Sequence, residues 1–124
     1  MNNKETGKLG ENIANKYLSG KDYLILAKNH KEKFDEIDII ARDPRGTLVF
    51  CEVKTMNNLN GQRSLFMPED NLSPMKLKKL IRGASVFLAK HPELIEGDRG
   101  WQIDLIAVTL KEKRMASVRH YKNI

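Results

Sequence analysis

The sequence predicts an α/β protein of the α+β kind, in which helices flank a sheet in the order α-β-β-β-α-β-β. Two segments carry apolar residues at the spacing of an amphipathic helix, and five shorter segments have the pattern of strands. Elements in this order build a sheet covered by helices. A chain of 124 residues is long enough for one layered core, so we expect a single domain over residues 1–124.

The first helix is expected over residues 6–19, where apolar side chains recur three and four residues apart. Thr6 is a suitable N-cap and Gly20 a suitable stop. Gly7 and Gly10 are too loosely spaced for a dinucleotide-binding loop, and close helix packing or local capping explains them better.

Three strands are expected next, over residues 23–27, 34–42 and 47–55. Residues 43–46, Asp-Pro-Arg-Gly, indicate a turn between the second and third strands, because proline fixes φ and glycine tolerates a positive φ. These two strands should therefore pair as an antiparallel hairpin.

A long surface loop is expected over residues 56–72, which are rich in polar side chains and show no periodicity. Ser73 and Pro74 fit the N-cap and first position of a second amphipathic helix, which ends near His91. This helix carries a basic face.

Two further strands are expected, over Trp101–Leu110 and, with a weaker pattern, over residues 115–121. Trp101 and Phe66 could stack on nucleic-acid bases, but a core position explains Trp101 better. The aromatic residues are too few to indicate a stacking platform.

Charged side chains stand inside two of the expected strands, where they lose hydration and need a partner or a metal ion. Glu36 and Asp38 share one face of the second strand, as Glu52 and Lys54 do on the third. If the two strands are neighbours, all four groups can converge. Carboxylates suit Mg²⁺, whereas zinc would call for Cys and His clusters that the sequence lacks.

A divalent ion beside a lysine suits phosphodiester hydrolysis, because the metal can polarise the phosphoryl oxygen and acidify the attacking water. Asp38 and Glu52 are then candidate metal ligands, assisted by Glu36. Lys54 would stabilise the pentavalent phosphate or orient the water. Two simpler interpretations stay open: the first two acids form a solvated strand face, and Glu52 pairs with Lys54 across strands.

Other polar residues fit structural roles. Asp104 lies within an apolar strand and fits a buried, hydrogen-bonded acid. The histidines are scattered singly, without the spacing of metal ligands. Cys51 fits a small core residue, and a single cysteine rules out a disulfide framework and agrees with a reducing compartment.

Composition bears on partners and compartment. Lys and Arg total 22 against 16 Asp and Glu, and the formal charge of +6 favours polyanionic partners such as nucleic acid. The N-terminus has no apolar signal segment and no apolar run reaches membrane-spanning length. We therefore expect a cytoplasmic protein with no membrane association.

Several short motifs extend along the chain. Residues 7–11 read Gly-Lys-Leu-Gly-Glu, residues 35–41 read Asp-Glu-Ile-Asp-Ile-Ile-Ala, and residues 50–56 read Phe-Cys-Glu-Val-Lys-Thr-Met. With Asn29, Lys76 and residues 103–105, they resemble the YraN-type family of uncharacterised bacterial proteins over nearly the whole chain. The same residues are similar to the PD-(D/E)xK nuclease superfamily, with Asp38 as the first acid and Glu52-Val53-Lys54 as the ExK element.

The resemblance implies a restriction-endonuclease-like fold with a mixed sheet, similar also to archaeal Holliday-junction resolvases. It implies a Mg²⁺- or Mn²⁺-dependent endonuclease acting on DNA, including branched or repair intermediates, and a homodimer. It adds Glu11 of the first helix to the metal ligands, although an acid in the first turn, placed against the helix dipole, is the simpler reading. Asp35 stands where the family has Gly, adding negative charge, and Met56 where it has Arg, weakening phosphate contact.

Four basic residues are candidate nucleic-acid contacts, in the loop or on the second helix: Arg63, Lys76, Lys79 and Arg82. A solvated basic face is the simpler interpretation, but Lys76 also matches the family's lysine. Two further functions stay open. One is a nucleic-acid-binding module that keeps the nuclease fold without turnover, and the other is an interaction domain that uses its basic helix to bind an acidic protein.

Overall fold

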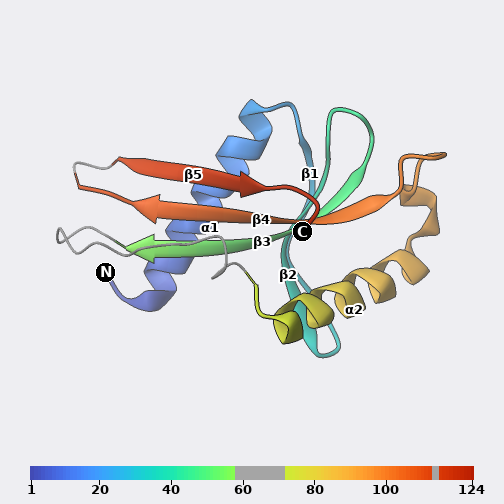
Figure 1. Cartoon of the computed structure of the whole chain (residues 1–124), viewed down its shortest axis with the longest axis horizontal. Helices are drawn as coiled ribbons and strands as arrows, with labels where there is room; N and C mark the ends of the chain where they lie inside the picture. The colour runs from blue at the N-terminus through green and yellow to red at the C-terminus, as the bar shows by residue number, and fades with distance from the viewer. Residues whose placement is uncertain (58–71, 113–114) are drawn as a thin grey trace.

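A five-stranded mixed sheet with a helix on each face forms the centre of the computed structural model, which describes residues 1–57, 72–112 and 115–124 (Figure 1). The predicted fold class and order of elements are confirmed. The helices and strands are α1 (Asn3–Gly20), β1 (Leu24–Glu32), β2 (Asp35–Arg42), β3 (Leu48–Asn57), α2 (Pro74–Lys90), the short 3-10 helix η2 (Pro92–Leu94), β4 (Trp101–Leu110) and β5 (Ala116–Tyr121).

The strands lie in the sheet in chain order, β1-β2-β3-β4-β5. Neighbours are antiparallel except β3 and β4, which run parallel from Leu48 opposite Trp101 to Asn57 opposite Leu110. A parallel pair needs a crossover connection, and α2 lies within the one used here.

Each face of the sheet has its own apolar core. On one face Ala14 and Leu18 of α1 pack with residues such as Cys51, which is fully buried as predicted. On the other face, Leu80, Ala84 and Phe87 of α2 pack with Ile37, Ile40, Leu48, Phe50 and Ile103. The two helices are therefore held against opposite sides of the sheet.

The predicted turn and helix start follow the expected chemistry. Asp43 Oδ1 accepts hydrogen bonds from the backbone N–H groups of Arg45 and Thr47, both at 2.9 Å, and Gly46 has a φ of 93°. The Ser73 hydroxyl caps α2 by accepting from the N–H of Lys76 at 3.1 Å. The antiparallel β2–β3 hairpin is thereby confirmed.

Two element boundaries differ from the prediction by more than two residues. Helix α1 begins at Asn3, because Asn2 rather than Thr6 is its N-cap and accepts from the Glu5 N–H at 2.8 Å. Strand β1 runs on to Glu32 instead of ending at residue 27, because its backbone keeps pairing with β2 beyond the apolar segment. An apolar pattern in the sequence indicates a strand with a buried face, whereas the hydrogen bonds that pair two strands need only backbone groups. Among the smaller differences, β3 continues to Asn57, two residues into the predicted loop, and most of that loop, residues 58–71, lies outside the described residues.

Trp101 and Asp104 both lie on β4, and the structure confirms the predicted role of Asp104 but not that of Trp101. Trp101 borders the core rather than anchoring it, since its side chain is 39% exposed and touches Phe50 edge-on, with ring centroids 5.7 Å apart. Asp104 is fully buried, as predicted, and accepts from His120 Nε2 at 2.7 Å and from the Asn123 N–H at 2.9 Å. These hydrogen bonds connect Asp104 of β4 to His120 of β5 and to the backbone at Asn123.

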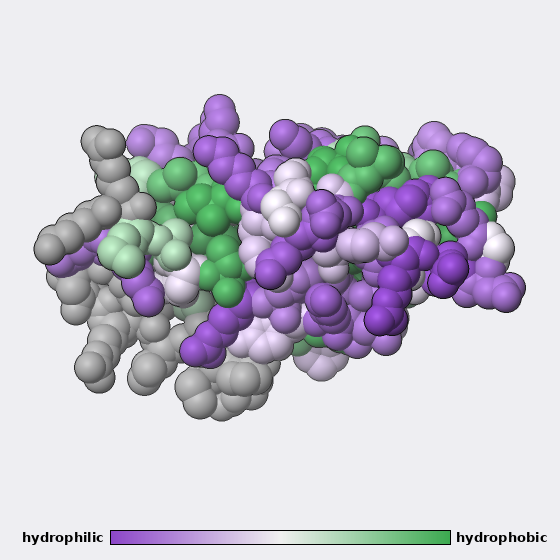
Figure 2. Space-filling model, turned by 90° about the horizontal axis from the view of Figure 1, so that it is seen from above, coloured by the Kyte–Doolittle hydropathy of each residue, from purple (hydrophilic) through white to green (hydrophobic). Residues whose placement is uncertain are grey.

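Figure 2 shows one face of the molecule, covered mostly by hydrophilic side chains, with apolar side chains gathered toward both ends, one of which is the end where the β4–β5 hairpin lies. An apolar hollow there is lined by Met1, Leu9, Ile13, Leu110, Lys111, Met115 and Ala116. In the described part of the chain, neither helix combines the length and the apolar character that crossing a membrane demands.

Helix α1 packs closely on β3 at Gly10. A Cβ atom added there would overlap the side chain of Thr55, whereas one added at Gly7 would meet nothing within 4 Å. Close helix packing, one of the two interpretations given for these glycines, thus applies to Gly10. This approach brings the next residue, Glu11, towards the sheet.

We expect Gly10→Ala to lower the free energy of unfolding by about 1–3 kcal/mol, because Thr55 or the helix must move to admit the methyl group. Gly7→Ala is the matched control: it should raise the free energy of unfolding by up to about 1 kcal/mol, since alanine favours the helix. Urea denaturation of both variants measures this. Equal effects of the two substitutions would contradict the packing argument.

Candidate metal and nucleic-acid site

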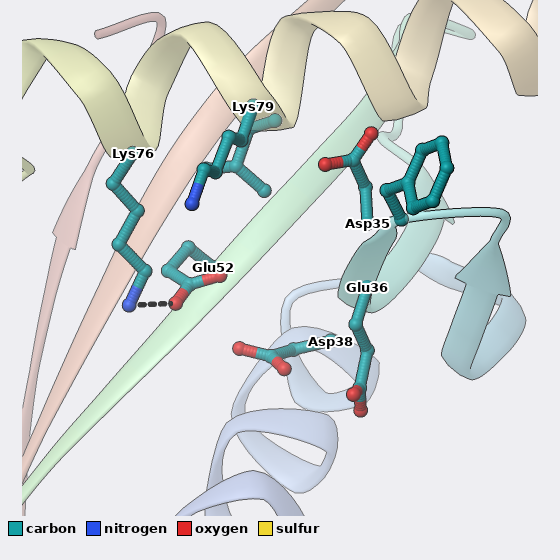
Figure 3. Close-up of a pocket in the computed structure, with 8 residues that line it drawn as sticks. Asp35, Glu36, Asp38, Glu52, Lys76 and Lys79 are labelled. Atoms are coloured by element: carbon teal, nitrogen blue, oxygen red, sulfur yellow. Dashed lines mark ion pairs between the residues drawn. The ribbon is translucent and has the colours of Figure 1, made fainter.

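An open cavity of about 300 Å³ lies between β2, β3 and α2 (Figure 3). We call it the acidic cavity, and its described lining is Phe34, Asp35, Glu36, Asp38, Glu52, Lys76, Lys79 and Leu80. Three of the four charged residues singled out in the strands thus meet there. The fourth, Lys54, is half-buried on β3 opposite Ala107 and is not among these lining residues.

The acids meet because β2 and β3 separate at this point. Their ladder ends with Ile39 opposite Cys51. Just beyond it, Asp38 Oδ2 accepts a hydrogen bond from the Val53 N–H at 2.8 Å. A side-chain carboxylate thus satisfies a backbone donor where the ladder ends, which fixes Asp38 between the strands.

The surroundings of Asp38 disfavour the charged form of its carboxyl group. Burial first, and then the charge of Glu52, raise the pKa of Asp38 from 3.8 to about 7. The N–H of Val53 lowers this pKa, while Glu11 and Glu36 raise it further. The repulsion among the carboxylates exceeds what the single N–H compensates, so the site favours a proton or another cation.

Glu11 belongs to the same cluster of acids. Because α1 begins at Asn3, Glu11 lies beyond the first turn, and the simpler reading of it as a first-turn acid is wrong. Burial and the charge of Glu36 raise the pKa of Glu11, while hydrogen bonds with Asn29 and Asp38 lower it. In the amide orientation that its surroundings require, Asn29 donates to both Glu11 oxygens, at 3.2 and 3.3 Å.

Two lysines of α2 reach over the opposite wall of the acidic cavity. Lys76 Nζ lies 2.7 Å from Glu52 Oε1, and Figure 3 shows this ion pair with Lys79 beside it. The Lys76 side chain is 56% exposed, whereas that of Glu52 is 10% exposed. The ammonium group is therefore close enough to neutralise Glu52 and exposed enough to move.

Asp35 is paired rather than free to add charge to the cavity. Arg82 donates to both Asp35 oxygens, at 2.8 and 2.9 Å, and this guanidinium lowers the pKa of Asp35. The expected extra charge next to Glu36 is thus compensated. Two N–H groups of Arg82 are used in this contact and are therefore not available to donate to nucleic acid. The other predicted nucleic-acid contact, Arg63, lies outside the described residues.

The donor set of the acidic cavity fits a hard divalent cation. Mg²⁺ takes oxygen ligands and is commonly held by one or two carboxylates with water and phosphate completing its shell. Asp38 and Glu52 supply that number, with Glu11 and Glu36 nearby. Within residues 1–57, 72–112 and 115–124, no three His, Cys, Asp or Glu side chains are already arranged to hold a metal on their own.

Some contacts of the site have no signal in the sequence. The pairs Glu52–Lys76 and Asp35–Arg82 join residues far apart in the chain, and only the packing of α2 on the sheet sets their partners. Asn29 could be found only as a family position. Phe34 has no signal either, because the sequence pattern places it at the start of the predicted strand 34–42, where one aromatic residue does not indicate a site.

Comparisons with other proteins agree with the motifs. Residues 10–108 match the model of the uncharacterised protein family UPF0102. A UPF0102 protein of Geotalea uraniireducens is 35% identical over 121 residues, covering 98% of this chain and 89% of that protein. One of Clostridioides difficile is 38% identical over 115 residues, covering 93% and 94%. The chain therefore belongs to the UPF0102 family, the YraN-type family that its motifs resemble.

Proposed function

We propose that this protein is a Mg²⁺- or Mn²⁺-dependent endonuclease that hydrolyses phosphodiester bonds in DNA. One observation carries the proposal: Asp38 and Glu52, from adjacent strands, line one cavity in which burial and mutual repulsion raise the pKa of Asp38 to about 7. Titratable groups whose pKa is shifted this far by burial and by neighbouring like charges are typical of functional sites. A cytoplasmic location and a homodimer stay predictions from the sequence.

In this proposal the protein's own groups bind and orient the substrate. Asp38 and Glu52 hold the divalent ion, with Glu11 and Glu36 assisting. When bound, such an ion polarises the phosphoryl oxygen and acidifies the attacking water. Lys54 stabilises the charge that develops on the phosphate or orients the water. Lys79 and Lys76 contact the flanking phosphates from the α2 side.

The test is incubation of duplex, branched and single-stranded DNA with Mg²⁺ or Mn²⁺. Wild-type protein should cleave at least one of them, and Glu52→Gln and Lys54→Ala should each lose about 100-fold or more. Glu112→Gln, at an exposed residue outside the cavity, is the matched control and should cleave normally. Cleavage that survives both site substitutions would come from a contaminant and would end the assignment.

Lys76 should compete with the metal for Glu52. We expect Lys76→Gln to tighten Mn²⁺ binding about two- to fivefold, because a half-exposed ion pair contributes about 1 kcal/mol or less. The same substitution should weaken binding to DNA. Calorimetry measures the first effect, with Lys78→Gln on the same helix as control. Weaker Mn²⁺ binding by Lys76→Gln alone would show that the lysine supports the metal instead.

A nucleic-acid-binding module without turnover is the second candidate. The Glu52–Lys76 ion pair favours it, because the lysine supplies a counter-charge to this acid without a metal. Such a module should bind DNA in EDTA, lose affinity steeply as salt rises and leave the strands intact. Divalent-ion binding at the acids, followed by cleavage, would decide against it.

A further inference from the structure

Phe34, in the turn between β1 and β2, is an apolar residue that the fold leaves in solvent. Its side chain is 76% exposed, more than any other large apolar residue in the described part of the chain. It nevertheless lines the acidic cavity together with Glu36 and Asp38. A single exposed apolar side chain is ordinary on a protein surface, so it is the position of Phe34 beside the charged side chains of the acidic cavity, and not its exposure, that indicates a contact surface.

The turn that carries Phe34 is held firmly at both ends. On one side Glu32 is buried and bonded to His30 Nε2 and Lys90 Nζ, both at 2.7 Å. On the other side Asp35 is bonded to Arg82 through two hydrogen bonds. Both Lys90 and Arg82 lie on α2, so side chains of this helix bind residues before and after Phe34.

Holding the turn reduces the entropy lost when Phe34 meets a ligand, because the backbone is ordered in advance. The charge around the ring favours an anionic partner as well. Lys33 Nζ lies 5.2 Å from the ring centroid, and Lys79 lines the same cavity. An aromatic face with ammonium groups nearby is the combination that binds a base and its phosphate.

Resting on the proposed function, we propose that Phe34 stacks on an unpaired base next to the phosphate held in the acidic cavity. The preferred substrate is then DNA that presents an unstacked base at the cleavage point, such as a single-stranded flap or gap. A continuous duplex would first have to unstack, at a cost of a few kcal/mol. A four-way junction in which every base is paired presents no unpaired base to Phe34, just as a duplex does not.

The test compares three DNAs of matched sequence: a duplex, a fully paired four-way junction and a flap with unpaired bases. Affinities are measured by fluorescence anisotropy with Ca²⁺ as the divalent ion. Wild-type protein should bind the flap about tenfold more tightly than the duplex. Phe34→Ala should abolish this preference and leave duplex affinity within about twofold, whereas Phe34→Trp should retain it.

A fluorescent base analogue, 2-aminopurine, placed at the unpaired position reports stacking without any cleavage. Wild type and Phe34→Trp should quench it, and Phe34→Ala should not. Leu24→Ala is the control, because Leu24 is an apolar residue 61% exposed at the other end of β1, paired with Arg42, and should change neither readout.

The outcomes separate this inference from the proposed function. A flap preference and quenching that survive Phe34→Ala overturn the stacking role, as do equal affinities of the wild type for all three DNAs. If the wild type still cleaves DNA in those cases, the nuclease function stands. If the wild type neither binds nor cleaves any DNA, the proposed function falls and the stacking role falls with it.

Discussion

Asp38→Asn should reduce metal-dependent cleavage of DNA about a thousandfold or more, the largest functional effect that we expect. The substitution keeps the size of the side chain and an oxygen that can still accept from the Val53 N–H. What it removes is the negative charge that, beside Glu52, would hold the divalent ion. Cleavage rates at saturating Mg²⁺ and Mn²⁺ measure the effect.

Asp98→Asn is the matched control for this variant, since Asp98 is exposed and lies outside the acidic cavity. It should cleave as the wild type does. If Asp38→Asn retains more than a tenth of the wild-type rate, Asp38 is not a required metal ligand and the proposed mechanism is wrong.

The same Asp38→Asn substitution should stabilise the metal-free fold at pH 8 by about 1–3 kcal/mol. Folding raises the pKa of Asp38 from 3.8 to about 7, so between these values the folded protein holds a proton that the unfolded chain has released. Stability therefore falls as pH rises through this window and is lowest above it. Asparagine removes the penalty at pH 8 and gains little near pH 4.

Urea denaturation in EDTA, at pH 8 and near pH 4, measures this second effect. Asp98→Asn should change stability little at either pH, because its carboxylate is exposed. A loss of stability for Asp38→Asn at pH 8 would contradict the account, since it would mean that the acid is compensated in the fold. Gain of stability with loss of cleavage is the combination expected of a residue kept for function.

The order and type of the elements could be predicted because the local signals agree with the packing. The Asp43 turn, the Ser73 cap and the apolar spacing of α1 each act within a few residues. The end of β1 could not be predicted, because its last residues are polar and pair through backbone groups alone. The extra turn of α1 was missed because Asn2 and Thr6 are both suitable caps.

The candidate site was predictable only in part for a similar reason. Acids inside apolar strands indicate a site, and the hairpin brings Asp38 and Glu52 to one cavity. The cations that meet them come from α2, and no local pattern reveals that Lys76 pairs with Glu52 or Arg82 with Asp35. The exposure of Phe34 likewise depends on how α2 holds the turn, which only the folded chain shows.

The most direct measurement is anomalous diffraction from a crystal of the wild-type protein soaked in Mn²⁺. We expect one peak bridged by the carboxylates of Asp38 and Glu52, with the Lys76 ammonium displaced from Glu52. An ordered acidic cavity that holds no manganese under these conditions, or manganese bound only elsewhere, would contradict the claim that these acids form a metal site.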